Sequence, residues 1–164
     1  LSAGRDRLTA ASLKRVPQVI SLGALDMVNF GPRDTVPDKF KDRRFYQHNQ
    51  AVTLMRTTPE ENDRLGKEIA EKASAAGGPI AVLIPLRGIS AIDREGQPFY
   101  WPEADQALFQ SLRNWIGPQV TLIELFFTYL TAKSKFIQFA AAIDVIETKE
   151  LPGIGWHALK GREE

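Results

Sequence analysis

Short apolar runs alternate with amphipathic segments along most of the chain, and this alternation predicts the secondary structure. Four runs have the length and the β-branched content of strands: residues 18–22 (QVISL), 51–55 (AVTLM), 79–86 (PIAVLIPL) and 119–125 (QVTLIEL). The third run is apolar at every position, which is typical of a strand buried on both faces of a sheet. The chain therefore contains several strands, and at least one of them is central.

Amphipathic helices separate these runs. The first is predicted over residues 58–78, where Thr58 is an N-cap, a proline follows it, and Glu61 completes a capping box. Its apolar side chains recur at helical spacing, and a Gly-Gly pair ends it. A second helix is predicted over residues 102–116. A weaker helical pattern covers residues 5–15.

Strand, helix and strand follow one another twice, over residues 51–86 and 79–125. Each unit implies parallel strands joined by a right-handed crossover, so the sequence predicts a layered α/β domain with a mostly parallel sheet. A chain of 164 residues is long enough for one such domain, residues 1–164, rather than two. Residues 31–49, rich in proline and charge, are predicted to form a long loop or a poorly regular excursion. Residues 126–147 suit either a continuing strand or a helix.

The composition narrows the choice of partners. With 21 basic and 20 acidic residues, the chain has a formal net charge of +1 and no overall field that would attract nucleic acid or a membrane surface. Because it has no cysteine, disulfides, thiolate metal sites and cysteine nucleophiles are excluded. No apolar stretch reaches the roughly 20 residues of a spanning helix. We therefore expect a cytoplasmic protein, and a chain that starts at Leu1 without methionine is expected to be a fragment of a longer one.

Polar residues follow three of the predicted strands, in segments 23–49, 56–58 and 87–100. Ligands of open parallel sheets bind outside the carboxyl ends of the strands, so these segments hold the candidate site. Arginine can clamp an anion there, and glycine and serine allow close approach to one. The candidate ligand-binding residues are Asp26, Asn29, Arg33, Asn49, Arg56, Thr57, Arg87, Gly88 and Ser90.

These candidates have structural alternatives. Asp26 and Asn29 are of the residue types that cap backbone groups in tight turns. Arg56 and Thr57 precede a helix N-terminus, which attracts anions, yet two glutamates already supply negative charge there, and capping of the helix is the other interpretation. Residues 87–90 lack the spacing of a P-loop or of a dinucleotide-binding turn.

His48 is the candidate catalytic residue. Imidazole titrates near neutral pH, as a general acid or base requires, although a lone histidine equally serves as a hydrogen-bonded structural residue. The second histidine, His157, is far along the chain. Neither a Ser-His-Asp arrangement nor a metal-binding pattern accompanies His48, so no metal site is predicted.

Three separated blocks resemble one known family. They are GALDMVNFG (23–31), HNQAVTLMRTTPEEN (48–62) and PLRGISAIDREGQPFYWPEAD (85–105). In this order they are similar to the second half of the tomato mosaic virus resistance protein family, over roughly residues 1–125. The resemblance implies two Rossmann-like halves, so we expect a Rossmann-like three-layer domain whose partner is the missing first half of the same protein. It also implies ATP, with magnesium, as the candidate cofactor.

The sequence departs from the family after residue 125. A polar segment with histidine and aspartate is expected there, and FFTYLTAKSKF stands in its place. If that segment helps to line the family's site, the activity of this chain differs from that of its relatives.

Three hypotheses follow for the function. The first is a ligand-binding domain that holds ATP or another small anion in a cleft between two halves. The second is an enzyme acting on a small carboxylate or phosphorylated metabolite, with His48 as acid or base and an arginine holding the anion. The third is a protein-interaction or homo-oligomerisation module that uses the apolar residues 126–139. The sequence leaves open whether any reaction is catalysed.

Overall fold

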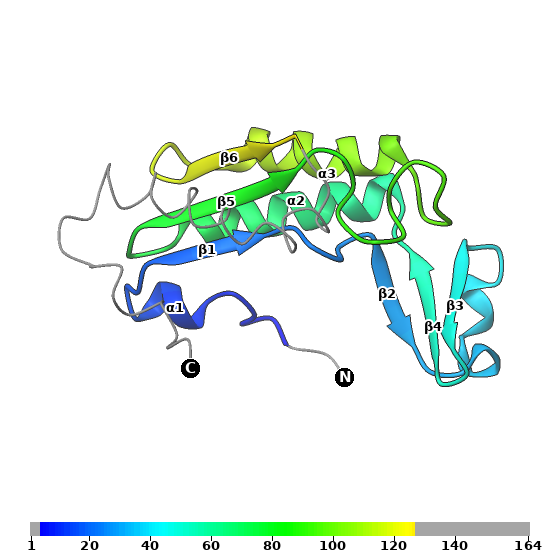
Figure 1. The fold of residues 1–164 in the computed structure, drawn as a ribbon. Helices are drawn as coiled ribbons and strands as arrows, with labels where there is room; N and C mark the ends of the chain where they lie inside the picture. Colours follow the sequence, from blue (N-terminus) through cyan, green and yellow to red (C-terminus); the bar gives the residue numbers. More distant parts are fainter. Residues whose placement is uncertain (1–3, 127–164) are drawn as a thin grey trace, which may run out of the picture.

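The computed structural model describes residues 4–126, which form two small sheets and two long helices (Figure 1). In chain order the helices and strands are α1 (Ala10–Leu13), β1 (Gln18–Ser21), β2 (Met27–Phe30), β3 (Phe45–Asn49), β4 (Val52–Arg56), α2 (Pro59–Ser74), β5 (Ile80–Pro85), α3 (Pro102–Trp115) and β6 (Thr121–Leu125).

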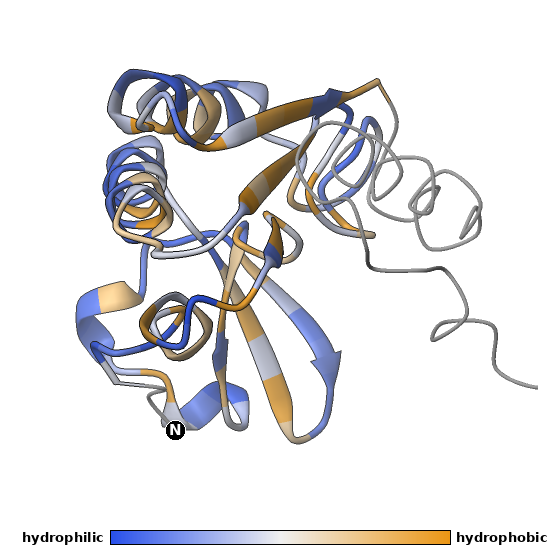
Figure 2. Cartoon of the chain, turned by 90° about the vertical axis from the view of Figure 1, so that its left-hand side faces the viewer, coloured by the Kyte–Doolittle hydropathy of each residue, from blue (hydrophilic) through white to orange (hydrophobic). Residues whose placement is uncertain are grey.

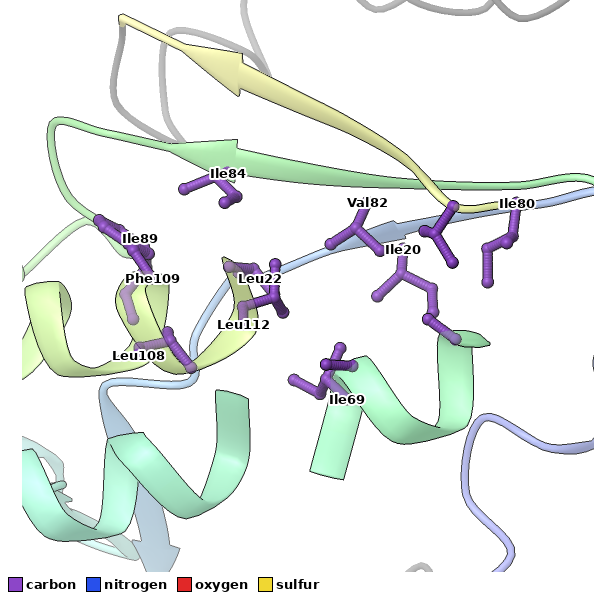
Figure 3. Close-up of a cluster of buried hydrophobic side chains, with 13 residues drawn as sticks. Ile20, Leu22, Ile69, Ile80, Val82, Ile84, Ile89, Leu108, Phe109 and Leu112 are labelled. Atoms are coloured by element: carbon purple, nitrogen blue, oxygen red, sulfur yellow. The ribbon is translucent and has the colours of Figure 1, made fainter. Parts of the chain in front are cut away.

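Strands β1, β5 and β6 form a parallel sheet with β5 in the centre. All of β5 is buried, as its continuous apolar run predicts. Helices α2 and α3 lie side by side against one face of this sheet (Figure 1), and their polar faces point away from it (Figure 2). Apolar side chains from the two layers meet between them (Figure 3), among them Ile20, Val82, Ile84, Leu108 and Phe109. This layer of side chains is the core.

The second predicted strand-helix-strand unit is confirmed. β5 pairs with β6 in parallel, from Ala81 opposite Thr121 to Pro85 opposite Leu125, and α3 connects them. The mixed α/β class is confirmed as well. A Rossmann-like arrangement in three layers stays a prediction.

The first predicted unit, residues 51–86, is wrong in its strand pairing. β4 lies outside the parallel sheet and is the central strand of an antiparallel sheet in the order β2-β4-β3. β3 and β4 are separated by only two residues, and so short a connection joins antiparallel strands only. Asn49 closes this turn, because its Oδ1 accepts a hydrogen bond from Ala51 N at 2.9 Å. The antiparallel sheet stands beyond the carboxyl end of β1 (Figure 1).

Residues 31–49 do not form the predicted long loop. Two 3-10 turns (Arg33–Thr35 and Asp38–Phe40) and β3 lie within them. Phe40 packs on Phe30 of β2, with ring centroids 5.6 Å apart. The alternation over β3 is weak, since two aromatic residues are followed by polar ones, and this is why the strand escapes a reading of the sequence.

The predicted start of α2 is confirmed. Thr58 Oγ1 accepts a hydrogen bond from Glu61 N (3.3 Å), and Thr58 N donates one to Glu61 Oε2 (2.8 Å), which together make the capping box. The helix predicted over residues 5–15 is confirmed only over α1. Leu8 and Arg15 adopt φ values of 70° and 56°, which a right-handed helix excludes.

The predictions for residues 126–147 and for the apolar surface 126–139 lie, apart from Phe126, outside the described residues. Within residues 4–126, none of the helices has the length and apolar character needed to cross a membrane.

Candidate functional site

A buried arginine ties the antiparallel sheet to the segment between β5 and α3. Arg56, the last residue of β4, is 0% exposed. Its Nη2 contacts Asp93 Oδ1 at 3.1 Å and Asp105 Oδ1 at 2.7 Å. Its Nε donates to Phe99 O (2.8 Å), and its Nη1 donates to Thr57 Oγ1 (3.0 Å). The guanidinium is therefore fully engaged inside the protein, where it holds residues 93–105 against the end of β4.

A second buried contact joins the loops that follow β1 and β5. Ser90 Oγ donates to Asp26 Oδ2 at 2.7 Å. The other carboxylate oxygen, Asp26 Oδ1, is buried and has no hydrogen-bond partner among the described residues. The same loop is fixed by Asp93, whose Oδ2 accepts from Ile89 N (3.1 Å).

Gly88 makes this tight loop possible. Its φ is +112°, a conformation that other residues rarely adopt, and a Cβ placed here would lie 1.9 Å from Asp93 O. In the loop that follows β5, the backbone at Gly88 thus packs tightly against the backbone carbonyl of Asp93. We call Asp26, Arg56, Ser90, Asp93 and Asp105 the buried charge cluster.

Burial raises the pKa values of the three carboxyl groups in the buried charge cluster. Desolvation raises the pKa of Asp26 to about 6. For Asp93, desolvation and then the charge of Asp105 raise the pKa to about 7. Desolvation also raises the pKa of Asp105, against the attraction of Arg56. Since one guanidinium faces three carboxyl groups, the cluster retains protons near neutral pH.

A pocket of about 500 Å³ opens next to this cluster. It lies where β5 ends and α3 begins, the position outside the carboxyl end of a parallel strand where ligands of such sheets bind. A volume of this size is in the range of small-molecule sites. Its lining includes Arg87, Arg94, Glu95, Tyr100, Asp105 and Phe109.

The structure divides the predicted site residues into two groups. Arg87 and Gly88 line the pocket. Four more, Asp26, Arg56, Thr57 and Ser90, are buried beside it in and around the buried charge cluster. The pocket and the cluster therefore bring together six of the nine candidate ligand-binding residues.

The remaining candidates lie on the antiparallel sheet or beside it. Asn29 is exposed on β2, and Arg33 lies 3.9 Å above the ring of Phe45. His48 is exposed on β3, next to Asn49, which pairs with Val52. His48 therefore lies near Val52, at the start of β4, whereas Arg56 of the buried charge cluster ends the same strand. Four residues of extended chain span about 13 Å, which separates His48 from the cluster.

Sequence reasoning missed the two carboxyl groups that pair with Arg56. Asp93 lies 37 positions after it and Asp105 lies 49 positions after it. Asp105 sits in the first turn of α3, where an acidic residue is explained by the helix dipole alone. An aspartate among apolar residues in the segment GISAID was the available signal for Asp93.

Within the described residues, no group of three or more His, Asp or Glu side chains is arranged to hold a metal ion. Although three aspartates meet in the buried charge cluster, the Arg56 guanidinium occupies the space between two of them. The Arg56 guanidinium supplies positive charge there.

These features define a small α/β domain with a polar pocket at the carboxyl edge of its parallel sheet. In the comparison with known families, residues 1–133 match the domain described as "Uncharacterised protein family (UPF0261) C-terminal domain". The chain belongs to this family, which confirms the resemblance drawn from the three sequence blocks.

Individual relatives extend well beyond this chain. A UPF0261 protein of Clostridium tetani is 53% identical over 76% of the chain, and one of Rhizobium meliloti is 48% identical over 71%. The ToMV resistance protein Tm-1(GCR237) of Solanum lycopersicum is 43% identical over 69%. The chain spans 31%, 29% and 15% of the lengths of these three relatives.

Proposed function

We propose that this domain binds a small anionic ligand in the pocket between the end of β5 and the start of α3. The observation that carries the proposal is the pair of arginines, Arg87 and Arg94, on the lining of that pocket. Both are exposed, and neither forms an ion pair within residues 4–126. Arginine outside an ion pair is well suited to bind a phosphate or carboxylate in two places at once.

The charges near the pocket support an anion more than a cation. Asp105 is already paired with Arg56, so its charge is compensated from inside the protein. The N-terminus of α3 is the positive end of the helix dipole, which favours an anion. Trp101 at the N-cap position makes no side-chain cap there. Glu95 on the lining and Glu103 in the first turn of α3 oppose an anion, and the two arginines have to outweigh them.

ATP with magnesium is one ligand of this class. The pocket volume suits a nucleotide, and Tyr100 and Phe109 on the lining offer rings to a base. In the longer relatives the missing first half is the candidate for the other wall of a cleft. If a nucleotide binds to the two-half protein and not to this chain alone, its site lies between the two halves.

Isothermal titration calorimetry with inorganic phosphate and with ATP, with and without magnesium, tests the proposal on the 164-residue chain and on the two-half protein. Loss of two charge-assisted contacts in the double variant Arg87→Ala/Arg94→Ala is expected to weaken binding by about tenfold or more. Arg64→Ala, which removes an exposed arginine on α2, is the matched control and keeps the affinity. Absence of heat from every probe, or equal affinity of the double variant, refutes the proposal.

An enzymatic role with His48 as acid or base is a separate hypothesis. His48 does not line the pocket, so a ligand in that pocket would not meet it without a larger rearrangement. Turnover of a metabolite pool by the two-half protein, repeated with His48→Ala, tests the hypothesis: unchanged turnover excludes His48 from the chemistry. Light scattering over a range of concentrations tests homo-oligomerisation. A molar mass that stays at the monomer value at every concentration counts against it.

A further inference from the structure

One carboxyl group of the buried charge cluster reaches the pocket. Asp105 lines it, although only 10% of the side chain is exposed. Its Oδ1 lies 2.7 Å from Arg56 Nη2, and the same Nη2 lies 3.1 Å from Asp93 Oδ1. Two carboxyl groups therefore meet around one guanidinium nitrogen, and one of the two faces the ligand space.

Two carboxyl groups held this close share a proton, because both do not ionise fully against a single positive charge. Burial, and after it the charge of Asp105, raise the pKa of Asp93 to about 7. Below that pH Asp93 keeps its proton, and Asp105 remains the acceptor of the pair, held by Arg56. A pair that contains both a proton and a free acceptor pairs well with a hydroxyl group, which donates and accepts in the same way.

The rest of the lining is of the kind that surrounds a hydroxylated ring. Glu95 and Gln106 add an acceptor and an amide beside Asp105, and Tyr100 and Phe109 add ring faces for C–H groups. Arg87 and Arg94 supply the positive charge. The polar groups are thus divided between anion-binding and hydroxyl-binding types.

We propose that the ligand is a small hydroxylated organic phosphate, such as a sugar phosphate, whose phosphate meets Arg87 and Arg94 and whose hydroxyl donates to Asp105. The inference rests on the proposed anion-binding function and adds the residue that selects among anions. Asp105 is a specificity-determining residue in this arrangement, with Asp93 and Arg56 as positioning residues.

The charges that face Asp105 come from three parts of the fold. Arg56 lies at the end of β4, Asp93 in the segment before α3, and Asp26 in the loop after β1. From the pocket, Arg87, Arg94 and Glu95 complete the set. A hydroxyl that donates to Asp105 favours the form of the pair in which Asp105 is ionised and Asp93 keeps the proton.

Calorimetry with two probes, inorganic phosphate and ribose 5-phosphate, tests this inference. The wild-type chain is expected to bind ribose 5-phosphate about tenfold more tightly, since one hydrogen bond to a charged group is worth about that factor. In Asp105→Asn the preference is expected to fall to near equality. Asp63→Asn, which removes an exposed carboxylate from α2 outside the pocket lining, keeps the preference.

A measurement on the wild type makes the test independent of how well Asp105→Asn folds. Methyl phosphate, an organic phosphate without a free hydroxyl group on its carbon, is titrated against the wild type in parallel. Ribose 5-phosphate is expected to bind about tenfold more tightly than methyl phosphate does. Equal affinities for the two esters overturn the inference and leave the anion site intact, whereas absence of binding by every probe overturns the proposed function itself.

Discussion

Replacement of Asp26 by asparagine tests whether the buried charge cluster weakens the fold as pH rises. Asp26 is 0% exposed, and burial raises the pKa of its carboxyl group from 3.8 to about 6. The native state therefore keeps a proton that the unfolded chain releases near pH 4. Consequently the free energy of unfolding falls as pH rises through this interval, and it is lowest above the native pKa.

The size of the effect follows from the shift. Each pKa unit corresponds to about 1.36 kcal/mol, so a rise from 3.8 to about 6 is equivalent to about 3 kcal/mol over the whole titration. About 2.4 kcal/mol of this falls between pH 4 and pH 7, because the carboxyl group of the unfolded chain is already more than half ionised at pH 4. Asp26→Asn keeps an oxygen that accepts from Ser90 and has no charge to desolvate. Relative to wild type, the variant is expected to gain about 2.4 kcal/mol over this pH range, whatever its absolute stability at pH 4.

Urea unfolding followed by tryptophan fluorescence at pH 4, 5, 6, 7 and 8 measures this difference. Asp63→Asn, an exposed carboxylate on α2, is the matched control and should follow the wild-type profile. Asp93 contributes to the pH dependence with the same sign, so part of the profile remains in Asp26→Asn. If wild type and Asp26→Asn lose stability in parallel between pH 4 and pH 7, the carboxyl group of Asp26 does not hold a proton in the native state and the reasoning is wrong.

Three further substitutions test how the site is held. Arg56→Met leaves Asp93 and Asp105 without their buried partner, so the free energy of unfolding in urea at pH 8 is expected to fall by about 3–5 kcal/mol. Because these carboxyl groups can take up protons, the fall should be smaller at pH 5, and a fall that does not depend on pH contradicts the account. Gly66→Ala places a Cβ 2.5 Å from Leu108 O of α3, and the forced separation of α2 and α3 should cost about 1–3 kcal/mol in thermal unfolding; no change would mean that the helices adjust freely. Thr58→Ala removes the capping box of α2, with an expected loss of about 1 kcal/mol by the same assay; Thr58→Ser should restore it, and failure to do so would assign the loss to the methyl group.

Local features of this fold can be read from the sequence because their causes are local. The capping box of α2 uses side chains three positions apart, and the buried run of β5 needs only its own composition. The loops after β1 and β5 are candidate site segments on the same footing, since the rule about strand ends depends on chain order alone. Arg87 and Gly88, from the second of these loops, line the pocket, and their role in ligand binding stays a prediction.

By itself the sequence determined the two long helices α2 and α3, the strands β1, β4, β5 and β6, the start of α2, and the α/β class, whereas β2 and β3 were not predicted. Only the tertiary structure decided that β4 leaves the parallel sheet for an antiparallel one, and that Arg56 meets Asp93 and Asp105 across 37 and 49 positions. The physical reason is the range of the interactions involved. Periodicity and capping act within a few residues, whereas strand partners and buried ion pairs are chosen by the free energy of contacts between distant segments, on which local pattern carries no information.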